Sequence, residues 1–234
     1  MKAYSRTNTG LVRDRNEDTV LADAEHGIYI LADGMGGHQA GEVASALAAE
    51  TLRDALAGES PAAERLHAAF RRANAAVFER QQQDSALNGM GTTMTALWDN
   101  GSHVLLGHVG DSRAYLFMNG RLRQISEDHS VVGEMLRSGA ITEEQARSHP
   151  YRNVITRAVG TEESVRADVV EILKTPGTLW LLCSDGLTDM VTDEQIAETL
   201  RQHAPEQAAD ALVDLALEQG GRDNVSLILL EVEA

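Results

Sequence analysis

The 234-residue sequence has one cysteine, four prolines, two lysines and no long apolar run. The single Cys183 excludes an internal disulfide framework and fits a reducing compartment. No run approaches the 18 apolar residues of a membrane span, and the N-terminus lacks a signal-peptide pattern. Because no Pro-rich linker or low-complexity tract divides the chain, we expect a single cytoplasmic domain over residues 1–234.

Basic residues are outnumbered, since 20 Lys and Arg stand against 36 Asp and Glu, and the formal net charge is −16. That balance argues against a protein that binds nucleic acid or anionic membranes, because phosphate groups favour clustered cations. The two lysines, Lys2 and Lys174, form no polybasic stretch. Hydrophobic residues make up 43% of the chain, far more than in a disordered acidic tail. We therefore expect a folded acidic protein that binds neither nucleic acid nor membrane.

The order of the patterns along the chain indicates the fold class. Short strands with turns are expected over residues 1–33 and 92–125, and Asn119-Gly120 between two of them predicts a hairpin. Ser60 is the expected N-cap of a helix that starts at Pro61. Further strands and paired helical patterns alternate in blocks: strands 169–173, 178–183 and 225–232, and helices 42–57, 61–83, 131–138, 142–149, 194–203 and 206–218. This order favours an α+β fold of mostly antiparallel sheets with helical layers outside.

Acidic residues stand beside glycine where apolar, strand-like runs end. Asp33-Gly34, Gly110-Asp111 and Asp185-Gly186 follow GIYILA, HVLLGHV and LWLLC, and two more acidic clusters lie at 13–18 and 222–224. A glycine lets the backbone turn sharply and brings a carbonyl oxygen near whatever the carboxylate binds. Carboxylate and carbonyl oxygens are the ligands that hard divalent cations prefer. One Asp-Gly pair is usually a plain turn, but several strand ends can meet at one edge of a sheet.

Other phosphate and hydrolase chemistries are excluded by missing motifs. A cysteine nucleophile in a phosphate loop needs an arginine six positions later, whereas Asp189 stands there after Cys183, so a buried structural thiol is the better interpretation. The chain has no G-x-x-x-x-G-K-[ST] P-loop, no G-x-S-x-G elbow and no H-E-x-x-H. Nucleotide-driven chemistry, a serine-hydrolase elbow and a zinc site are therefore not expected.

Eight ordered motifs carry a resemblance to a known family: GLVRDRNED (10–18), LADGMGGHQAGEVAS (31–45), MGTT (90–93), VGDSRAY (109–115), EDHS (127–130), RNVITRAVG (152–160), CSDGLTD (183–189) and GGRDNVS (220–226). Together they resemble the bacterial branch of the metal-dependent Ser/Thr protein phosphatases of type 2C, the PPM family. The resemblance implies a four-layer α-β-β-α sandwich of two mostly antiparallel sheets flanked by helix pairs. It also implies a small helical flap at about 130–150, where substrate choice should be sought.

The resemblance also implies a role for each residue that matches the family's motifs. Two ions of Mn²⁺ or Mg²⁺ would be bound, with a third, weaker site seen in bacterial members, and a metal-activated water would hydrolyse phosphoserine and phosphothreonine. The matching positions are Asp33 bridging the two ions, Gly34 through its carbonyl and Glu17 on the second, Asp185 and Asp223 on the first, Asp111 with Asp185 at the third site, Asp18 acting through water, and Arg13 gripping the substrate phosphate.

One position departs from the eukaryotic relatives, which place a histidine directly after the Asp-Gly pair. Met35 stands there and is expected to pack, so the general acid is unassigned. His38 is expected to cap or order a loop, with catalysis as the alternative, and His129 to be structural or to anchor the flap. Arg157 is expected to form a structural ion pair and not to contact phosphate.

Three functions remain open for comparison. The first is a protein serine/threonine phosphatase that acts on phosphorylated proteins and opposes a bacterial Ser/Thr kinase. The second is a hydrolase of small phosphomonoesters, and the third a metal-binding signalling module without turnover. The resemblance favours the first, acting as a monomer.

Overall fold

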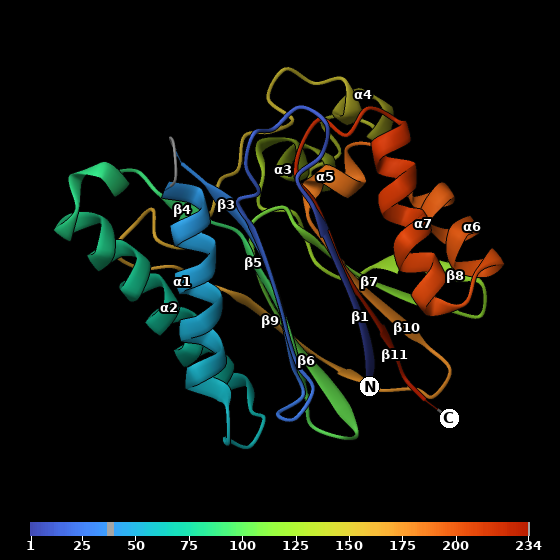
Figure 1. Ribbon diagram of the computed structural model, residues 1–234, viewed down its shortest axis with the longest axis horizontal. Helices are drawn as coiled ribbons and strands as arrows, with labels where there is room; N and C mark the ends of the chain where they lie inside the picture. The colour runs from blue at the N-terminus through green and yellow to red at the C-terminus, as the bar shows by residue number, and fades with distance from the viewer. Residues whose placement is uncertain (37–39, 234) are drawn as a thin grey trace.

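The computed structural model describes residues 1–36 and 40–233, and these form four layers in the order α-β-β-α (Figure 1). One sheet has the strand order β1-β11-β10-β7-β8, and the other has β2-β3-β5-β6-β9 with β4 paired to β3. All described strand pairs are antiparallel. The strands are β1 Lys2–Asn8, β2 Asp18–Asp23, β3 Ile28–Met35, β4 Gly91–Thr92, β5 Met94–Asp99, β6 His103–Val109, β7 Arg113–Met118, β8 Arg121–Gln124, β9 Asp168–Leu173, β10 Leu179–Cys183 and β11 Val225–Glu231.

Helix pairs cover the outer faces of both sheets. Helices α1 (Ala40–Leu56) and α2 (Ala63–Gln83) lie on the six-stranded sheet, and α6 (Asp193–Gln202) and α7 (Pro205–Glu218) lie on the five-stranded sheet (Figure 1). The remaining helical segments are short: the 3₁₀ turn η1 Ser85–Leu87, α3 Val131–Arg137, α4 Glu143–Arg147 and α5 Asp185–Thr188. The four-layer arrangement expected from the sequence is thus confirmed, as are the two short helices at 130–150.

Alternation along the strands builds the buried layers. In β3, Ile28 and Ile30 pack toward α1 and α2, while Tyr29 and Leu31 pack between the two sheets. A third cluster joins the five-stranded sheet to α6 and α7. With apolar cores on both faces of each sheet, the strand ends are held on a rigid scaffold.

The strand ends that carry the acidic motifs meet at one end of the sandwich. Asp18, the first residue of β2, pairs directly with Asp33 near the end of β3. The end of β10 lies beside the start of β11, because Cys183 pairs with Leu227. The link 110–112 leads from β6 in one sheet to β7 in the other. Both sheets therefore contribute acidic residues to the same end.

Of the two local signals named from the sequence, the hairpin is confirmed and the helix cap is wrong. The Asn119-Gly120 hairpin joins β7 and β8, with φ of 53° and 74° at the two residues. Thr142 caps α4 with a complete capping box. The second long helix, however, begins at Ala63 and not at Pro61, because its first turn closes from the Leu66 amide onto the Ala62 carbonyl at 3.0 Å. Ser60 therefore lies outside the helix and is not its N-cap.

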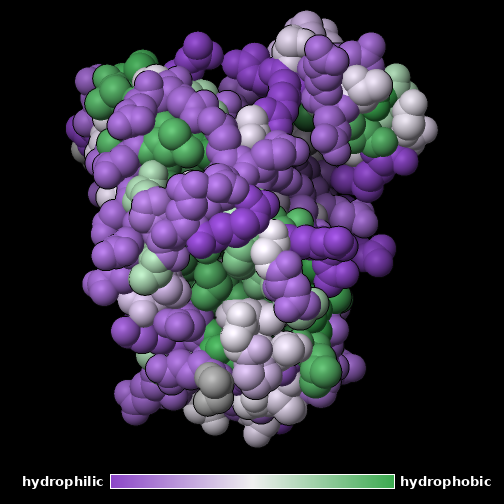
Figure 2. All heavy atoms as spheres, turned by 90° about the vertical axis from the view of Figure 1, so that its right-hand side faces the viewer, coloured by the Kyte–Doolittle hydropathy of each residue, from purple (hydrophilic) through white to green (hydrophobic). Residues whose placement is uncertain are grey.

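The surface agrees with the composition. On the face shown in Figure 2, hydrophilic side chains cover most of the molecule, and hydrophobic ones show in its middle and lower part and in smaller groups at the upper left and upper right. No helix among the described residues is long and apolar enough to cross a membrane. Cys183 is a free, fully buried thiol, and burial raises its pKa to about 12. That confirms its structural role.

Candidate metal centre

Asp33 and Gly34 lie near the C-terminal end of strand β3, where backbone hydrogen bonds fix their positions. The Asp33 amide donates to Thr93 Oγ1 at 3.0 Å, and the Thr93 amide donates to the Asp33 carbonyl at 2.8 Å. The Gly34 amide donates to the Glu17 carbonyl at 3.2 Å. A Cβ on Gly34 would lie 2.1 Å from the Gly41 carbonyl oxygen, so only glycine lets the start of α1 approach this turn. The glycine thus allows Glu17, Asp33 and α1 to come together.

Four buried carboxylates at this end carry raised pKa values: Asp18, Asp33, Asp111 and Asp185. Burial raises the pKa of Asp18 to about 7 and that of Asp185 to about 6. The pKa values of Asp33 and Asp111 are raised well above their usual range, first by burial and then by the negative charges of Asp18 and Asp185 respectively. Burial also raises the pKa of Glu17, an effect that the nearby Arg13 opposes. These groups lose hydration and repel one another, which is the environment that a bound cation stabilises.

Two oxygens in this group have no hydrogen-bond partner. Glu17 Oε1 and Asp18 Oδ1 are buried without a donor, whereas Asp18 Oδ2 accepts from the Ser184 hydroxyl at 3.0 Å. A buried carboxylate oxygen without a donor is costly, and a cation is the partner that would satisfy it. The chemistry of the donor set therefore fits a hard divalent ion.

The acidic side chains among the described residues are of the right type for a metal ion but do not stand close enough to coordinate one. Over residues 1–36 and 40–233, no group of three or more His, Cys, Asp or Glu side chains is arranged so that it could hold a metal ion as it stands. The acidic residues share one neighbourhood, but they do not form a closed coordination shell.

Arg13 lies in the loop between β1 and β2 and faces the same group. Its Nη2 is 2.6 Å from Asp223 Oδ2, and the side chains of Arg13 and Asp223 are 52% and 34% exposed. The guanidinium is thus open to solvent at the edge of the acidic group. A guanidinium in this place can present paired N–H donors to an anion that approaches from solvent.

Asn224 holds the Arg13 loop against the start of β11. Its Oδ1 accepts from the Glu17 amide at 2.8 Å, and its Nδ2 donates to the carbonyls of Thr9 and Arg15 at 3.0 and 2.8 Å. The buried amide therefore spans the loop on both sides of Arg13. Sequence analysis did not single out this residue, although it stands directly after Asp223.

The Asp111 loop is held by two histidines. Gly110 has φ of 111°, and a Cβ there would lie 2.5 Å from Thr93 Cβ. His108 Nδ1 pairs with the Thr95 hydroxyl. Because a carbonyl oxygen only accepts, the Nε2–H of His108 donates to the Gly110 carbonyl at 2.9 Å, and burial lowers the pKa of His108 to about 4. The Gly110 amide donates to His129 Nδ1 at 3.1 Å. These contacts fix the backbone directly before Asp111.

His129 and Arg157 have the structural roles expected of them. His129 Nε2 pairs with Asp168 Oδ2 at 3.0 Å, and the His129 carbonyl accepts from the Thr156 amide. Arg157 Nη1 lies 3.0 Å from Asp168 Oδ1. The ion pair of Arg157 is confirmed, and His129 makes structural contacts as expected, whereas its role in anchoring a flap stays a prediction. His38 lies outside the described residues, and Met35 lines a pocket beside β3.

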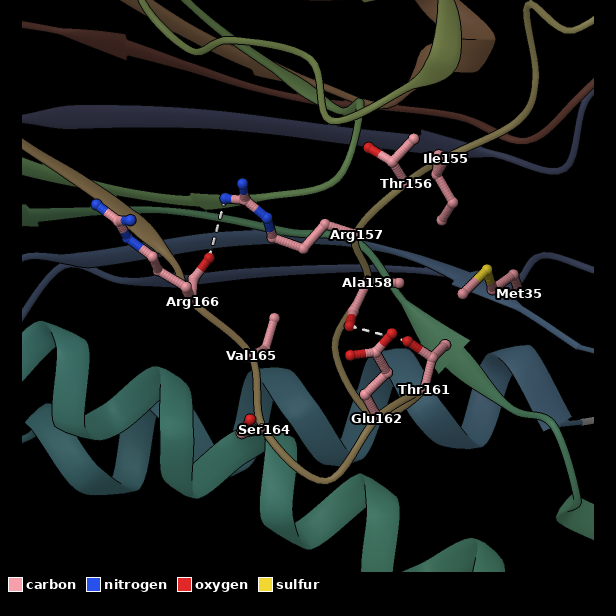
Figure 3. A pocket seen from close by; sticks show the side chains of 10 residues that line it. All are labelled: Met35, Ile155, Thr156, Arg157, Ala158, Thr161, Glu162, Ser164, Val165 and Arg166. Carbon is pink, nitrogen blue, oxygen red and sulfur yellow. Dashed lines mark hydrogen bonds between the residues drawn. The ribbon is translucent and has the colours of Figure 1, made fainter. Parts of the chain in front are cut away.

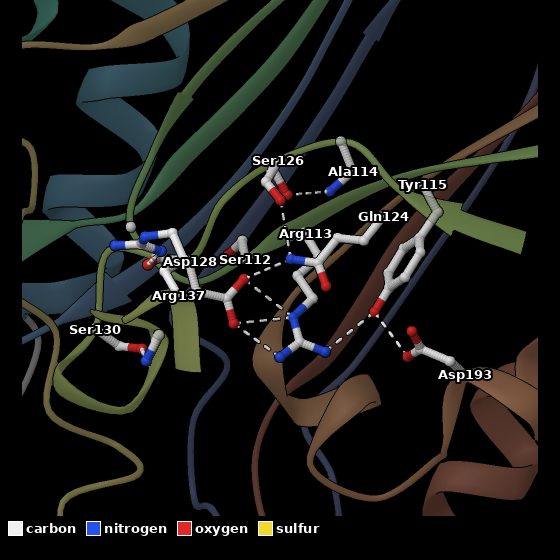
Figure 4. A network of polar contacts seen from close by, with 12 residues as sticks. Ser112, Arg113, Ala114, Tyr115, Gln124, Ser126, Asp128, Ser130, Arg137 and Asp193 are labelled. Atoms are coloured by element: carbon white, nitrogen blue, oxygen red, sulfur yellow. Dashed lines mark hydrogen bonds and ion pairs between the residues drawn. The ribbon is translucent and has the colours of Figure 1, made fainter. Parts of the chain in front are cut away.

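Arg113 is the centre of a polar network that sequence analysis missed (Figure 4). Its guanidinium contacts both carboxylate oxygens of Asp128, with Nη2 2.7 Å from Oδ2, and its Nη1 donates to the Tyr115 hydroxyl. That hydroxyl donates to Asp193 at the start of α6. Arg113 thus ties the strand after Asp111 to Asp128, directly before the segment 130–150.

Asp189 is a second residue that sequence analysis left without a role. It stands at the C-cap of α5, four residues after Asp185. After burial, the charge of Asp189 is the largest influence that raises the pKa of Asp185. The sequence signal that could have identified Asp189 was its position at the end of the motif CSDGLTD.

Comparison with known proteins identifies the family. The model of the family described as Protein phosphatase 2C matches residues 5–217. The chain belongs to the protein phosphatase 2C family. The catalytic domain of the serine/threonine protein phosphatase PstP, solved in complex with two manganese ions, is 39% identical with a TM-score of 0.91, over 100% of this chain and 98% of that one.

Two curated members of the 2C family are similar in sequence. The serine/threonine protein phosphatase PstP of Mycobacterium tuberculosis is 42% identical over 99% of this chain, which spans only 45% of that relative's length. The serine/threonine phosphatase stp of Listeria monocytogenes is 40% identical over 99% of this chain and 96% of its own length. The chain therefore corresponds to nearly the whole of one relative and to about half of the other.

Proposed function

We propose that the chain is a Mn²⁺- or Mg²⁺-dependent protein serine/threonine phosphatase. The observation that carries the proposal is the group of desolvated carboxylates from both sheets, with the Arg13 guanidinium at its solvent edge. Family membership and the two manganese ions of the PstP structure support the same chemistry.

Each metal position has proposed ligands in this chain. Asp33 would bridge two ions, Glu17 and the Gly34 carbonyl would hold the second, and Asp185 and Asp223 the first. Asp111 with Asp185 would hold a third ion more weakly, and Asp18 would act through a water. Bound divalent ions supply a nucleophilic water near neutral pH and neutralise phosphate charge.

The remaining steps belong to the chain's own side chains. Arg13 leaves Asp223 to bind two phosphate oxygens, because its fork of donors matches their spacing. It thereby orients the phosphorus for in-line attack and stabilises charge on the equatorial oxygens. Met35 has no proton to give, so the leaving alkoxide would take its proton from water or from His38, which lies outside the described residues.

We also propose the biological setting. The substrates would be proteins phosphorylated on serine or threonine by a cognate kinase, and the chain would act as a monomeric single domain over residues 1–234 with its flap at about 130–150. The match of the family model to residues 5–217 supports the single domain. A cytoplasmic location is supported by the buried free thiol of Cys183.

Release of phosphate from phosphothreonine peptides in Mn²⁺ tests the proposal. Wild type should turn over and Asp33→Asn should not, whereas Asp14→Asn, an exposed carboxylate of the Arg13 loop, serves as the matched control. Higher kcat/KM for sugar phosphates than for peptides would favour the small-molecule hydrolase. Equal rates for wild type and Asp33→Asn would refute the proposal.

A further inference from the structure

A pocket of about 450 Å³ opens beside the end of β3. Its wall is the segment 155–166, which connects the flap to β9, and Met35 closes it on the side of β3. Figure 3 shows the guanidinium groups of Arg157 and Arg166 on one side of the pocket and Met35 on the other. None of these three side chains was assigned to the metal centre or to phosphate binding.

The pocket lies within reach of a substrate chain. Met35 is two residues after Asp33 in β3, so the two side chains stand on the same face of the strand. Two residues of strand span roughly 7 Å. An extended peptide with its phosphorylated side chain at Asp33 would therefore bring a residue a few positions away to Met35 and the pocket.

The pocket wall is held in place by the protein itself. Val159 pairs with Thr92 through two backbone hydrogen bonds of 3.0 and 2.8 Å. From α2, Asn74 bonds to the Gly160 amide and to the carbonyls of Glu162 and Glu163. Such a preformed wall costs little ordering when a ligand binds.

Charge on the pocket is distributed unevenly. Arg157 uses only Nη1 for its bonds to Asp168 and to the Arg166 carbonyl, and its other N–H groups have no partner among the described residues. The Arg166 guanidinium has no ion pair or hydrogen bond within the same part of the chain and is exposed. The Glu162 carboxylate lies beside Thr161, away from both guanidinium groups (Figure 3). The arginine side therefore offers one cation without an ion pair among the described residues, Arg166, and the unused N–H donors of Arg157, whose charge is partly balanced by Asp168.

We propose that this pocket binds an acidic side chain of the phosphoprotein substrate, two or four residues from the phosphorylated residue. The even spacing follows because side chains two apart in an extended chain point the same way. The carboxylate contacts Arg166 and the free donors of Arg157, and Glu162 repels it from the opposite side. The proposal rests on the proposed phosphatase function and names the substrate feature that the enzyme selects.

Peptide pairs test this pocket directly. Phosphothreonine peptides carry Glu or Gln at positions two and four residues before or after the phosphothreonine, and kcat/KM is measured with Mn²⁺. Wild type should prefer Glu at one of these positions. Arg166→Gln should lower kcat/KM for that Glu peptide by about two- to fivefold and leave the Gln peptide unchanged, as expected for an exposed ion pair. Glu162→Gln should raise kcat/KM for the Glu peptide. Arg72→Gln, an exposed arginine of α2 outside the pocket, should change neither.

The contrast between Arg166→Gln and Arg72→Gln distinguishes a subsite from a general effect of charge, because both substitutions remove one positive charge. The pocket proposal is overturned if Arg166→Gln and Arg72→Gln act alike, or if no position prefers Glu. Fluorescence anisotropy of the same labelled peptides gives a readout that needs no turnover. Binding that prefers Glu but is not followed by hydrolysis would support the pocket and refute the phosphatase function. Hydrolysis without any preference for Glu would support the phosphatase function and refute the pocket.

Discussion

Arg13 Nη2 lies 2.6 Å from Asp223 Oδ2, although the two residues are 210 positions apart in the chain. The side chain proposed to bind phosphate is therefore held by a side chain proposed to bind metal. This pairing keeps a half-exposed guanidinium beside the acidic group, where its conformational freedom is already reduced.

Substituting Arg13 should impair substrate binding more than turnover. Arg13→Ala removes two charge-assisted hydrogen bonds to phosphate, so kcat/KM should fall by about 10- to 100-fold, mostly through KM. Arg13→Lys keeps the charge without the fork and should recover only part of the loss. Steady-state kinetics on a phosphothreonine peptide measures both. An unchanged KM in Arg13→Ala would contradict phosphate binding by this residue.

Asn224→Ala should loosen the Arg13 loop. The change leaves the Glu17 amide and the carbonyls of Thr9 and Arg15 without their partner, which should cost about 2 to 4 kcal/mol of unfolding free energy. Mn²⁺ affinity should fall as well, because Glu17 is no longer positioned. Urea unfolding and calorimetry measure the two effects, with the exposed Asn88→Ala as control. Lower stability with unchanged Mn²⁺ affinity would show that Asn224 does not position the site.

The Arg113–Asp128 pair should control the base of the flap. Arg113→Ala leaves a carboxylate that is only 14% exposed without its partner, at a cost of about 2 to 4 kcal/mol. Asp128 also accepts from Arg137 through its carbonyl, so cleavage within 130–150 by a protease should become faster. A double-mutant cycle with Asp128→Asn should show strong coupling. Additive effects of the two substitutions would show that the Arg113–Asp128 pair does not hold the segment 130–150 in place.

The metal-free protein should lose stability as the pH rises. Asp18 has a folded-state pKa of about 7, raised from 3.8, so its protonated form favours the folded state. The folded chain thus binds more protons than the unfolded chain, and this contribution is fully present below pH 4 and lost as the pH rises through 7. In EDTA, Tm should fall between pH 5 and 7.5, and Asp18→Asn should flatten the slope. A Tm that rises over this interval in wild type would contradict the raised pKa.

Sequence alone predicted the fold well because its signals are local. Alternating apolar runs, the Asn119-Gly120 turn and the acidic residues at strand ends can all be read from neighbouring positions. The prediction of Ser60 as an N-cap was wrong. The pair of a capping residue and a proline occurs at the first helical turn, but it also occurs in the chain just before a helix, and the helix here begins at Ala63.

Contacts between distant residues could not be predicted in the same way. The hydrogen bonds of Asn224 to the Arg13 loop and the Arg113 network depend on how strands from different parts of the chain align. The pairing of Arg13 with Asp223 depends on the positions of both the loop between β1 and β2 and the start of β11. For the same reason the motifs identify the candidate ligands of the metal centre without giving their mutual distances.

Binding of Mn²⁺ to wild type and Asp185→Asn, measured by titration calorimetry, tests the central claim most directly, with Asp14→Asn as control. The metal-centre account predicts at least two Mn²⁺ ions per wild-type and control chain, fewer in Asp185→Asn, and no phosphate release by that variant. If Asp185→Asn bound as many ions as tightly as wild type and kept its turnover, the proposed metal centre would be contradicted.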